Sequence, residues 1–189
     1  MKVFAALLIS IFILHGCAVT PPPGAYLNAD IRYDLPTNPW QGGRLDAFQQ
    51  LTIAFEDKVL FLQVFIALAP GQAKITLLDM SGRRALDINW GRDDLQIYRA
   101  DWLPKSARAE DVLARLVLAY WPVDIARMGL PAAAKLRLQE NERFIETASG
   151  LILSITSNAH NPWMGTTIID QPGADFHLTI SSRLQDESE

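Results

Sequence analysis

Short runs in which hydrophobic and polar positions alternate, separated by brief polar turns, fill most of the chain. A period of two is typical of β-strands with one buried face. Because the turns between the runs are short, we expect consecutive strands to pair as an antiparallel meander. The alternation predicts strands at residues 51–55, 59–68, 74–78, 85–90, 95–99, 136–139, 143–146, 151–156, 166–169 and 176–181.

One predicted strand, residues 59–68, is apolar on both faces apart from Gln63. Such a strand is either covered on both sides or lines an apolar cavity with one of them. If Gln63 faces solvent, the period of two gathers the other alternate side chains on the opposite face. These are Leu60, Leu62, Val64, Ile66 and Leu68.

The pattern changes to a helical period after residue 101. Glu110 and Asp111 place acids in a first turn, apolar residues follow at helical spacing, and Pro122 ends the segment. This predicts a helix at residues 109–121, followed by a short helical turn at 123–130. The apolar positions of the helix that we assign to the candidate site are Leu113, Leu116, Val117, Tyr120 and Trp121.

Many strands, then one or two helices, then more strands predict a mainly β fold with helices (α+β). Two interpretations of its apolar surface remain open. In one, a curved antiparallel sheet with the helix as a lid holds an acyl chain against its concave face. In the other, the same side chains fill an ordinary core. From the remaining strands, the candidate lining residues are Ile75, Leu77, Ile88 and Trp90.

The N-terminus has the features of an export signal. Lys2 precedes an apolar stretch at residues 3–14 that is too short to cross a bilayer of about 30 Å. Leu-His-Gly-Cys at residues 14–17 resembles the lipobox of bacterial lipoproteins, which implies removal of residues 1–16 and lipidation of Cys17. Two or three acyl chains would make a stable membrane anchor. Because Ala18 follows the cysteine, the resemblance implies the outer membrane, on its periplasmic face.

The segments on either side of the main domain differ from it in composition. Residues 17–30 contain three consecutive prolines, and we expect them to form the lipidated N-terminus and an extended tether. Residues 31–184 are expected to form a single domain. Residues 185–189 form an acidic tail that we expect to fray.

Composition narrows the classes of partner and chemistry. Of the 189 residues, 49% are hydrophobic, which excludes a mostly disordered chain, and a net charge of -4 argues against a nucleic-acid partner. The single cysteine excludes an intrachain disulfide. His160 and His177 lie far apart in the sequence and lack the spacing of metal ligands, so we expect no metal site. The sequence contains no glycine-rich phosphate loop, so we also expect no cofactor.

Catalytic patterns are also missing. No Gly-x-Ser-x-Gly elbow is present, so we expect a protein that is not an enzyme, with no catalytic residues. The enzymatic alternative is a hydrolase or acyltransferase that uses Ser157 with His160 or His177. It requires a serine and a histidine within hydrogen-bond reach in a cleft.

The overall pattern resembles the LolA and LolB superfamily of periplasmic lipoprotein carriers and receptors. More specifically, the stretches at residues 86–90, 111–113 and 116–122 resemble an uncharacterised bacterial lipoprotein family, a domain of unknown function associated with gene clusters for aryl polyene or fatty-acid-like lipids. The resemblance covers most of residues 26–184. It implies a half-open barrel of antiparallel strands, a helical lid and a hydrophobic cavity. The nearest match to the membrane-touching loop of LolB-like receptors is at residues 68–71.

These observations lead to two main hypotheses. The first is a non-enzymatic outer-membrane lipoprotein that binds or relays a lipid, an acyl chain or an acylated molecule such as a lipoprotein, and releases it when the helix shifts. The second is a structural or interaction module with a filled core that scaffolds an envelope or lipid-biosynthesis complex. An exposed apolar patch rather than a cavity would mark the second.

Overall fold

A computed structural model of the chain describes residues 23–55, 58–105, 107–174 and 176–185. Cys17, the signal segment and most of the acidic tail lie outside the described residues. None of the helices in the described part has the length and hydrophobicity needed to cross a membrane.

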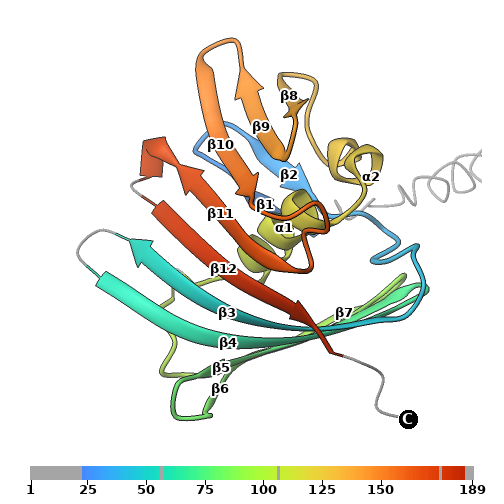
Figure 1. Cartoon of the computed structure of the whole chain (residues 1–189), viewed down its shortest axis with the longest axis vertical. Coiled ribbons are helices and arrows are strands. Elements are labelled where there is room, and N and C mark those ends of the chain that lie inside the picture. Colours follow the sequence, from blue (N-terminus) through green and yellow to red (C-terminus); the bar gives the residue numbers. More distant parts are fainter. Residues whose placement is uncertain (1–22, 56–57, 106, 175, 186–189) are drawn as a thin grey trace, which may run out of the picture.

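The described residues build a curved, ten-stranded antiparallel sheet with the strand order β7-β6-β5-β4-β3-β12-β11-β10-β9-β8 (Figure 1). Strands from the middle of the chain, β3 to β7, form one half of the sheet, and strands from the C-terminal part, β8 to β12, form the other half. The strands are β3 (Leu45–Phe55), β4 (Lys58–Ala69), β5 (Gln72–Asp79), β6 (Arg84–Gly91), β7 (Leu95–Arg99), β8 (Ala134–Gln139), β9 (Glu142–Thr147), β10 (Gly150–Ser157), β11 (Gly165–Gln171) and β12 (Phe176–Leu184).

Pairing of β3 with β12 joins the two meanders into one sheet. The ladder runs from Phe176 opposite Phe55 to Leu184 opposite Ala47. The sheet ends at β7 on one side and β8 on the other, so it does not close into a full barrel. This confirms the predicted mainly β, antiparallel and half-open fold.

Figure 1 shows one helix, α1 (Ala109–Tyr120), inside the curve of the sheet and a second, α2 (Val123–Met128), near β8. A single turn of 3₁₀ helix, η1 (Pro172–Ala174), joins β11 to β12. The C-terminal end of α1 is held by Arg143, whose Nη1 donates to the carbonyl oxygens of Leu118 and Trp121 at 2.8 Å each. These bonds satisfy carbonyls that a helix end leaves without partners.

The folded part begins earlier in the chain than predicted. Two short strands, β1 (Gly24–Tyr26) and β2 (Arg32–Asp34), pair with each other, and Ala25 and Leu27 are fully buried. Tyr33 on β2 donates its hydroxyl to the carbonyl of Ala126 on α2 at 3.0 Å. Residues 24–30, expected in the tether, therefore belong to the folded part, because the alternate apolar residues Ala25 and Leu27 pack into the core.

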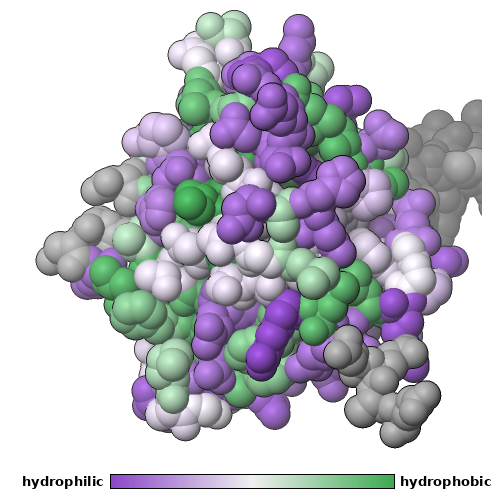
Figure 2. Space-filling model, viewed as in Figure 1, coloured by the Kyte–Doolittle hydropathy of each residue, from purple (hydrophilic) through white to green (hydrophobic). Residues whose placement is uncertain are grey.

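The two faces of β4 differ in exposure. Its inner side chains from residue 62 to residue 68 are buried, while Val59, Phe61 and Phe65 on the outer face are 54%, 56% and 39% exposed. Phe65 meets Phe48 of β3 at 5.1 Å between ring centroids. Hydrophobic and hydrophilic residues are otherwise interspersed on the face of the molecule seen in Figure 2.

Candidate functional site

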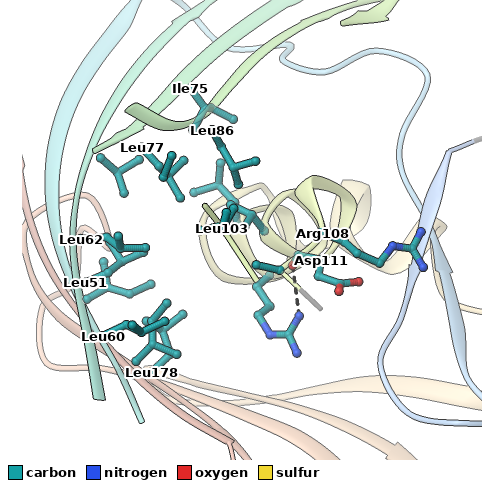
Figure 3. A pocket seen from close by; sticks show the side chains of 18 of the residues that line it. Leu51, Leu60, Leu62, Ile75, Leu77, Leu86, Leu103, Arg108, Asp111 and Leu178 are labelled. Carbon is teal, nitrogen blue, oxygen red and sulfur yellow. Dashed lines mark hydrogen bonds between the residues drawn. The ribbon is translucent and has the colours of Figure 1, made fainter. Parts of the chain in front are cut away.

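A cavity of about 320 Å³ lies between the concave face of the sheet and the N-terminal half of α1. Leucine side chains of the sheet face α1 across it (Figure 3). Apolar side chains dominate the lining, and among the described residues that line it five carry polar or charged groups. The apolar lining consists of Leu51, Ile53, Leu60, Leu62, Val64, Ile75, Leu77, Ala85, Leu86, Leu103, Pro104, Ala107, Val112, Leu116, Phe176, Leu178 and Ile180.

The lining runs from an exposed rim to a buried interior. At the rim, Lys58 and Pro104 are exposed and Leu60 is 44% exposed, whereas Leu62 and Leu77 inside are buried. A ligand could therefore enter at the rim and place an apolar part on the interior leucines. This arrangement suits small-molecule sites, which are concave and mostly apolar with a few polar groups.

The loop between β7 and α1 forms part of the rim. Arg99, at the end of β7, donates Nη2 to the carbonyl oxygens of Leu103 and Pro104 at 2.5 Å, and its Nε reaches the carbonyl of Ala107 at 3.4 Å. One arginine thus positions the segment that brings Leu103 over the cavity.

The structure divides the predicted site residues into two groups. Leu60, Leu62, Val64, Ile75, Leu77 and Leu116 line the cavity. The others are buried in the core outside its lining. This second group consists of Ile66, Leu68, Ile88, Trp90, Leu113, Val117, Tyr120 and Trp121.

Sequence reasoning also missed part of the lining. Leu51, Leu86, Leu178 and Ile180 lie within predicted strands, and their alternation could have placed them on the same face. The loop at residues 103–107 has no periodic signal, so its contribution is visible only in three dimensions.

An aromatic cluster fills the space beyond the cavity, and we call it the aromatic plug. Trp121 is its centre, with ring centroids 5.2 Å from Trp40, 6.1 Å from Trp163 and 6.5 Å from Trp90. Tyr120 meets Trp163 at 4.5 Å. Trp121 also donates its Nε1 to the carbonyl of Pro39 at 2.5 Å. The plug consists of Trp40, Trp90, Tyr120, Trp121 and Trp163.

A buried polar network links the cavity to the plug. Gln49, which lines the cavity, donates Nε2 to the Ser182 hydroxyl at 3.0 Å, and that hydroxyl lies 3.0 Å from the Tyr120 hydroxyl. Burial raises the pKa of Tyr120, and the hydrogen bond with Ser182 opposes the rise. Tyr120 is therefore a neutral hydroxyl at physiological pH.

Charged groups gather where α1 borders the cavity. The lining includes Lys58, Arg108, Asp111 and Arg115. In Figure 3, Arg108 and Asp111 extend away from the leucines of the sheet. Burial raises the pKa of Asp111, and the nearby guanidinium of Arg115 opposes that rise. The sheet side of the cavity is thus mostly apolar apart from Gln49 and Lys58, and the charged groups Arg108, Asp111 and Arg115 lie at or beside α1.

The hydrogen bonds of Ser157 and His177 do not join these two residues to each other. The Ser157 hydroxyl donates to the carbonyl of Ala159 at 3.1 Å, while the His177 ring contacts Asp170 at 2.5 Å and Thr179 at 3.1 Å. His177 alternates with cavity-lining residues on β12 and so lies on the outer face. In the described part of the chain, no three His, Cys, Asp or Glu side chains gather as a metal site would require.

Comparison with known families assigns most of the fold to one of them. Residues 46–183 match a family described as a protein of unknown function, DUF3261. The chain belongs to this family. The DUF3261 match includes every residue that lines the cavity, whereas Trp40 of the aromatic plug precedes it.

One solved structure provides a further comparison. A LolA superfamily protein from Nitrosomonas europaea is similar with a TM-score of 0.44 and 11% sequence identity, over 80% of this chain and 92% of that chain. No curated protein matches the chain.

Proposed function

We propose that this member of the DUF3261 family is a non-enzymatic lipoprotein, anchored to the periplasmic face of the outer membrane through Cys17, that binds or relays a lipid or acyl chain. The observation that carries the proposal is the cavity of about 320 Å³ with its leucine interior and exposed rim. Transfer of an acyl chain from water into such a site is worth about 0.8 kcal/mol for each buried methylene.

The geometry also suggests how a chain would enter and leave. Arg143 and Trp121 fix the C-terminal end of α1, while its N-terminal half and the preceding loop border the cavity. We therefore propose that the opening movement involves Leu103, Pro104, Ala107 and the first turns of α1 rather than the whole helix.

Extraction of the purified mature protein with organic solvent tests binding directly. The covalent anchor stays on Cys17, so mass spectrometry of the extract reports molecules held without covalent bonds. We expect an acyl-containing compound at about one molecule per protein. Extracts that contain nothing enriched over those of an unrelated lipoprotein, prepared in the same way, would contradict the proposal.

Replacement of the lipidated residue tests the anchor separately. We expect Cys17→Ala to remove the protein from the outer-membrane fraction, with Ser10→Ala in the apolar signal segment as a control that leaves fractionation unchanged. If the Cys17→Ala protein still fractionates with the outer membrane, the lipoprotein assignment is wrong.

The exposed outer face of β4 favours a second candidate function, that of an interaction module. Val59, Phe61 and Phe65 place apolar side chains on one strand face in contact with solvent. Isolated exposed apolar residues are common, but several on one face can mark a binding surface. Loss of a co-purifying envelope protein in Phe61→Ser, with lipid content unchanged, would support this function instead.

A further inference from the structure

Arg115 occupies an unusual place in the cavity wall. It lies on α1, contacts the Phe176 ring at 4.5 Å from the centroid and is partly buried beside apolar lining. Its Nη1 donates to the backbone carbonyl of Asp111 at 3.1 Å, and its Nη2 donates to Oε1 of Gln171 at 2.9 Å. Both acceptors are neutral.

One donor of this guanidinium has no acceptor. Its Nε is closed off from solvent and has no hydrogen-bond partner. Burial lowers the pKa of Arg115 and the nearby charge of Asp111 opposes this shift, although an arginine remains protonated at physiological pH. A buried cation with neutral acceptors only is costly unless a counter-charge is nearby.

The protein does not supply that counter-charge through a direct ion pair. Asp111 is the single acidic residue among the described residues that line the cavity, and Arg115 contacts its backbone carbonyl rather than its carboxylate. Lys58 and Arg108 add two more cations to the same lining. The guanidinium of Arg108 reaches outward, 3.6 Å from Glu110. With Arg108 paired in this way, the lining still contains two further cations, Lys58 and Arg115, and one acid, Asp111.

We propose, on the basis of the acyl-binding function above, that the ligand is a single-chain amphiphile with an anionic head group, which Arg115 binds while the chain lies on the leucines of the sheet. An anionic oxygen entering from the cavity would add to Arg115 the direct ion pair that its two neutral acceptors do not provide. A guanidinium fork matches a carboxylate or a phosphate, and charge-assisted hydrogen bonds of this kind are the stronger ones.

The volume argues for one chain. At about 320 Å³, the cavity is at the lower end of the range of about 300–1,000 Å³ for small-molecule sites. A lipid with two or three chains would leave much of its apolar surface outside. The leucine interior and the arginine edge together match a molecule with one apolar tail and one charged end.

Calorimetric titration of the delipidated mature chain carrying Cys17→Ala tests the proposal with three probes, namely dodecanoate, dodecyl phosphate and 1-dodecanol. We expect the better of the two anions to bind about tenfold or more tightly than the alcohol, as a charged hydrogen bond predicts. The ranking of dodecanoate and dodecyl phosphate identifies the head group.

Substitutions then assign the preference to Arg115. Arg115→Gln should weaken anion binding by about tenfold or more and leave dodecanol binding unchanged. Arg137→Gln is the matched control. Arg137 is a surface arginine of β8 bound to Glu146, so its replacement removes the same charge at a position away from the cavity. Should Arg115→Gln fail to fold, Arg115→Lys keeps the charge without the fork and should show a smaller loss of the same kind.

The outcomes separate this proposal from the function on which it rests. If dodecanol binds as tightly as both anions, or if Arg115→Gln weakens all three probes equally, the cavity binds acyl chains without recognising an anionic head group. If none of the probes binds, the acyl-binding function itself is wrong.

Discussion

The two ends of the space inside the curved sheet are built from the same strands but differ in how they are filled. At one end, the aromatic plug packs rings against one another around Trp121. At the other, leucine and isoleucine side chains leave a cavity of about 320 Å³. On β4 the division falls within a single face, because Leu62 and Val64 line the cavity while Ile66 and Leu68 belong to the solid core.

This contrast shows that elements outside the sheet decide which part of its concave face is filled. Trp40 comes from the segment before β3, Trp121 follows α1 and Trp163 lies in the loop before β11. Each large ring buries about 150–250 Å². At the cavity end, the described lining residues of the loop before α1 are Leu103, Pro104, Ala107 and Arg108, and the three apolar ones have smaller side chains than the rings of the plug.

Truncation at the two ends should give the largest difference. We expect Trp121→Ala to cost about 3–5 kcal/mol of unfolding free energy, because it removes the centre of the plug and its bond to Pro39. Leu77→Ala should cost about 2 kcal/mol, the low end for such changes, because Leu77 already borders empty space. Urea unfolding of both variants measures the difference. Equal costs would mean that the cavity end is packed as tightly as the plug.

Sequence patterns predicted the sheet well because alternation reports directly which strand face is buried. The same alternation could not separate Val64 from Ile66, because both side chains face inward. They differ only in that Val64 borders the cavity and Ile66 is packed against other side chains. The strands at residues 24–26 and 32–34 escaped detection because each is only three residues long and the first follows a proline run.

Arg115 illustrates a second limit of sequence patterns. Asp111 and Arg115 are spaced as an ordinary i, i+4 pair, which on a solvent-exposed helix face is commonplace. The fold instead places Phe176 and Gln171 of the distant β11–β12 hairpin against the guanidinium. Only this tertiary contact turns a surface charge into part of a cavity wall.

Larger side chains on the inner face of β4 should also distinguish the cavity from the filled core, with a smaller effect on stability than the truncations. Leu62→Phe projects into the cavity, so we expect a result between no change and a gain of about 1 kcal/mol in stability, together with loss of dodecanoate binding. Ile66→Phe, on the same face of β4 but outside the lining, should cost about 1–3 kcal/mol through overpacking. Urea unfolding and calorimetric titration distinguish the two. A large loss of stability in Leu62→Phe would show that the cavity cannot accept a larger group.

The smallest effect that we expect is a change in pH dependence at the cavity end. Burial raises the pKa of Asp111, so the folded chain binds this proton more tightly than the unfolded chain does. The stability that Asp111 contributes is therefore fully present below its unfolded pKa of about 3.9 and is lost as the pH rises through the higher folded pKa. Asn at this position cannot titrate. The stability of the wild type relative to Asp111→Asn should thus fall with increasing pH across this window and stay constant above it.

Tyr120→Phe in the plug is the control for this measurement, because burial raises the pKa of Tyr120 above its ordinary value near 10. Tyr120 stays protonated from about pH 3 to about pH 7, a range that includes the pKa of a carboxyl group in the unfolded chain. The effect of Tyr120→Phe on stability should therefore be the same at every pH in this range. Asp111→Asn should also strengthen dodecanoate binding at neutral pH, since it removes the negative charge nearest Arg115 in the lining. If the pH profile of Asp111→Asn runs parallel to that of the wild type, the carboxyl is solvated, and the charged side of the cavity beside α1 is a water-filled edge rather than a binding surface.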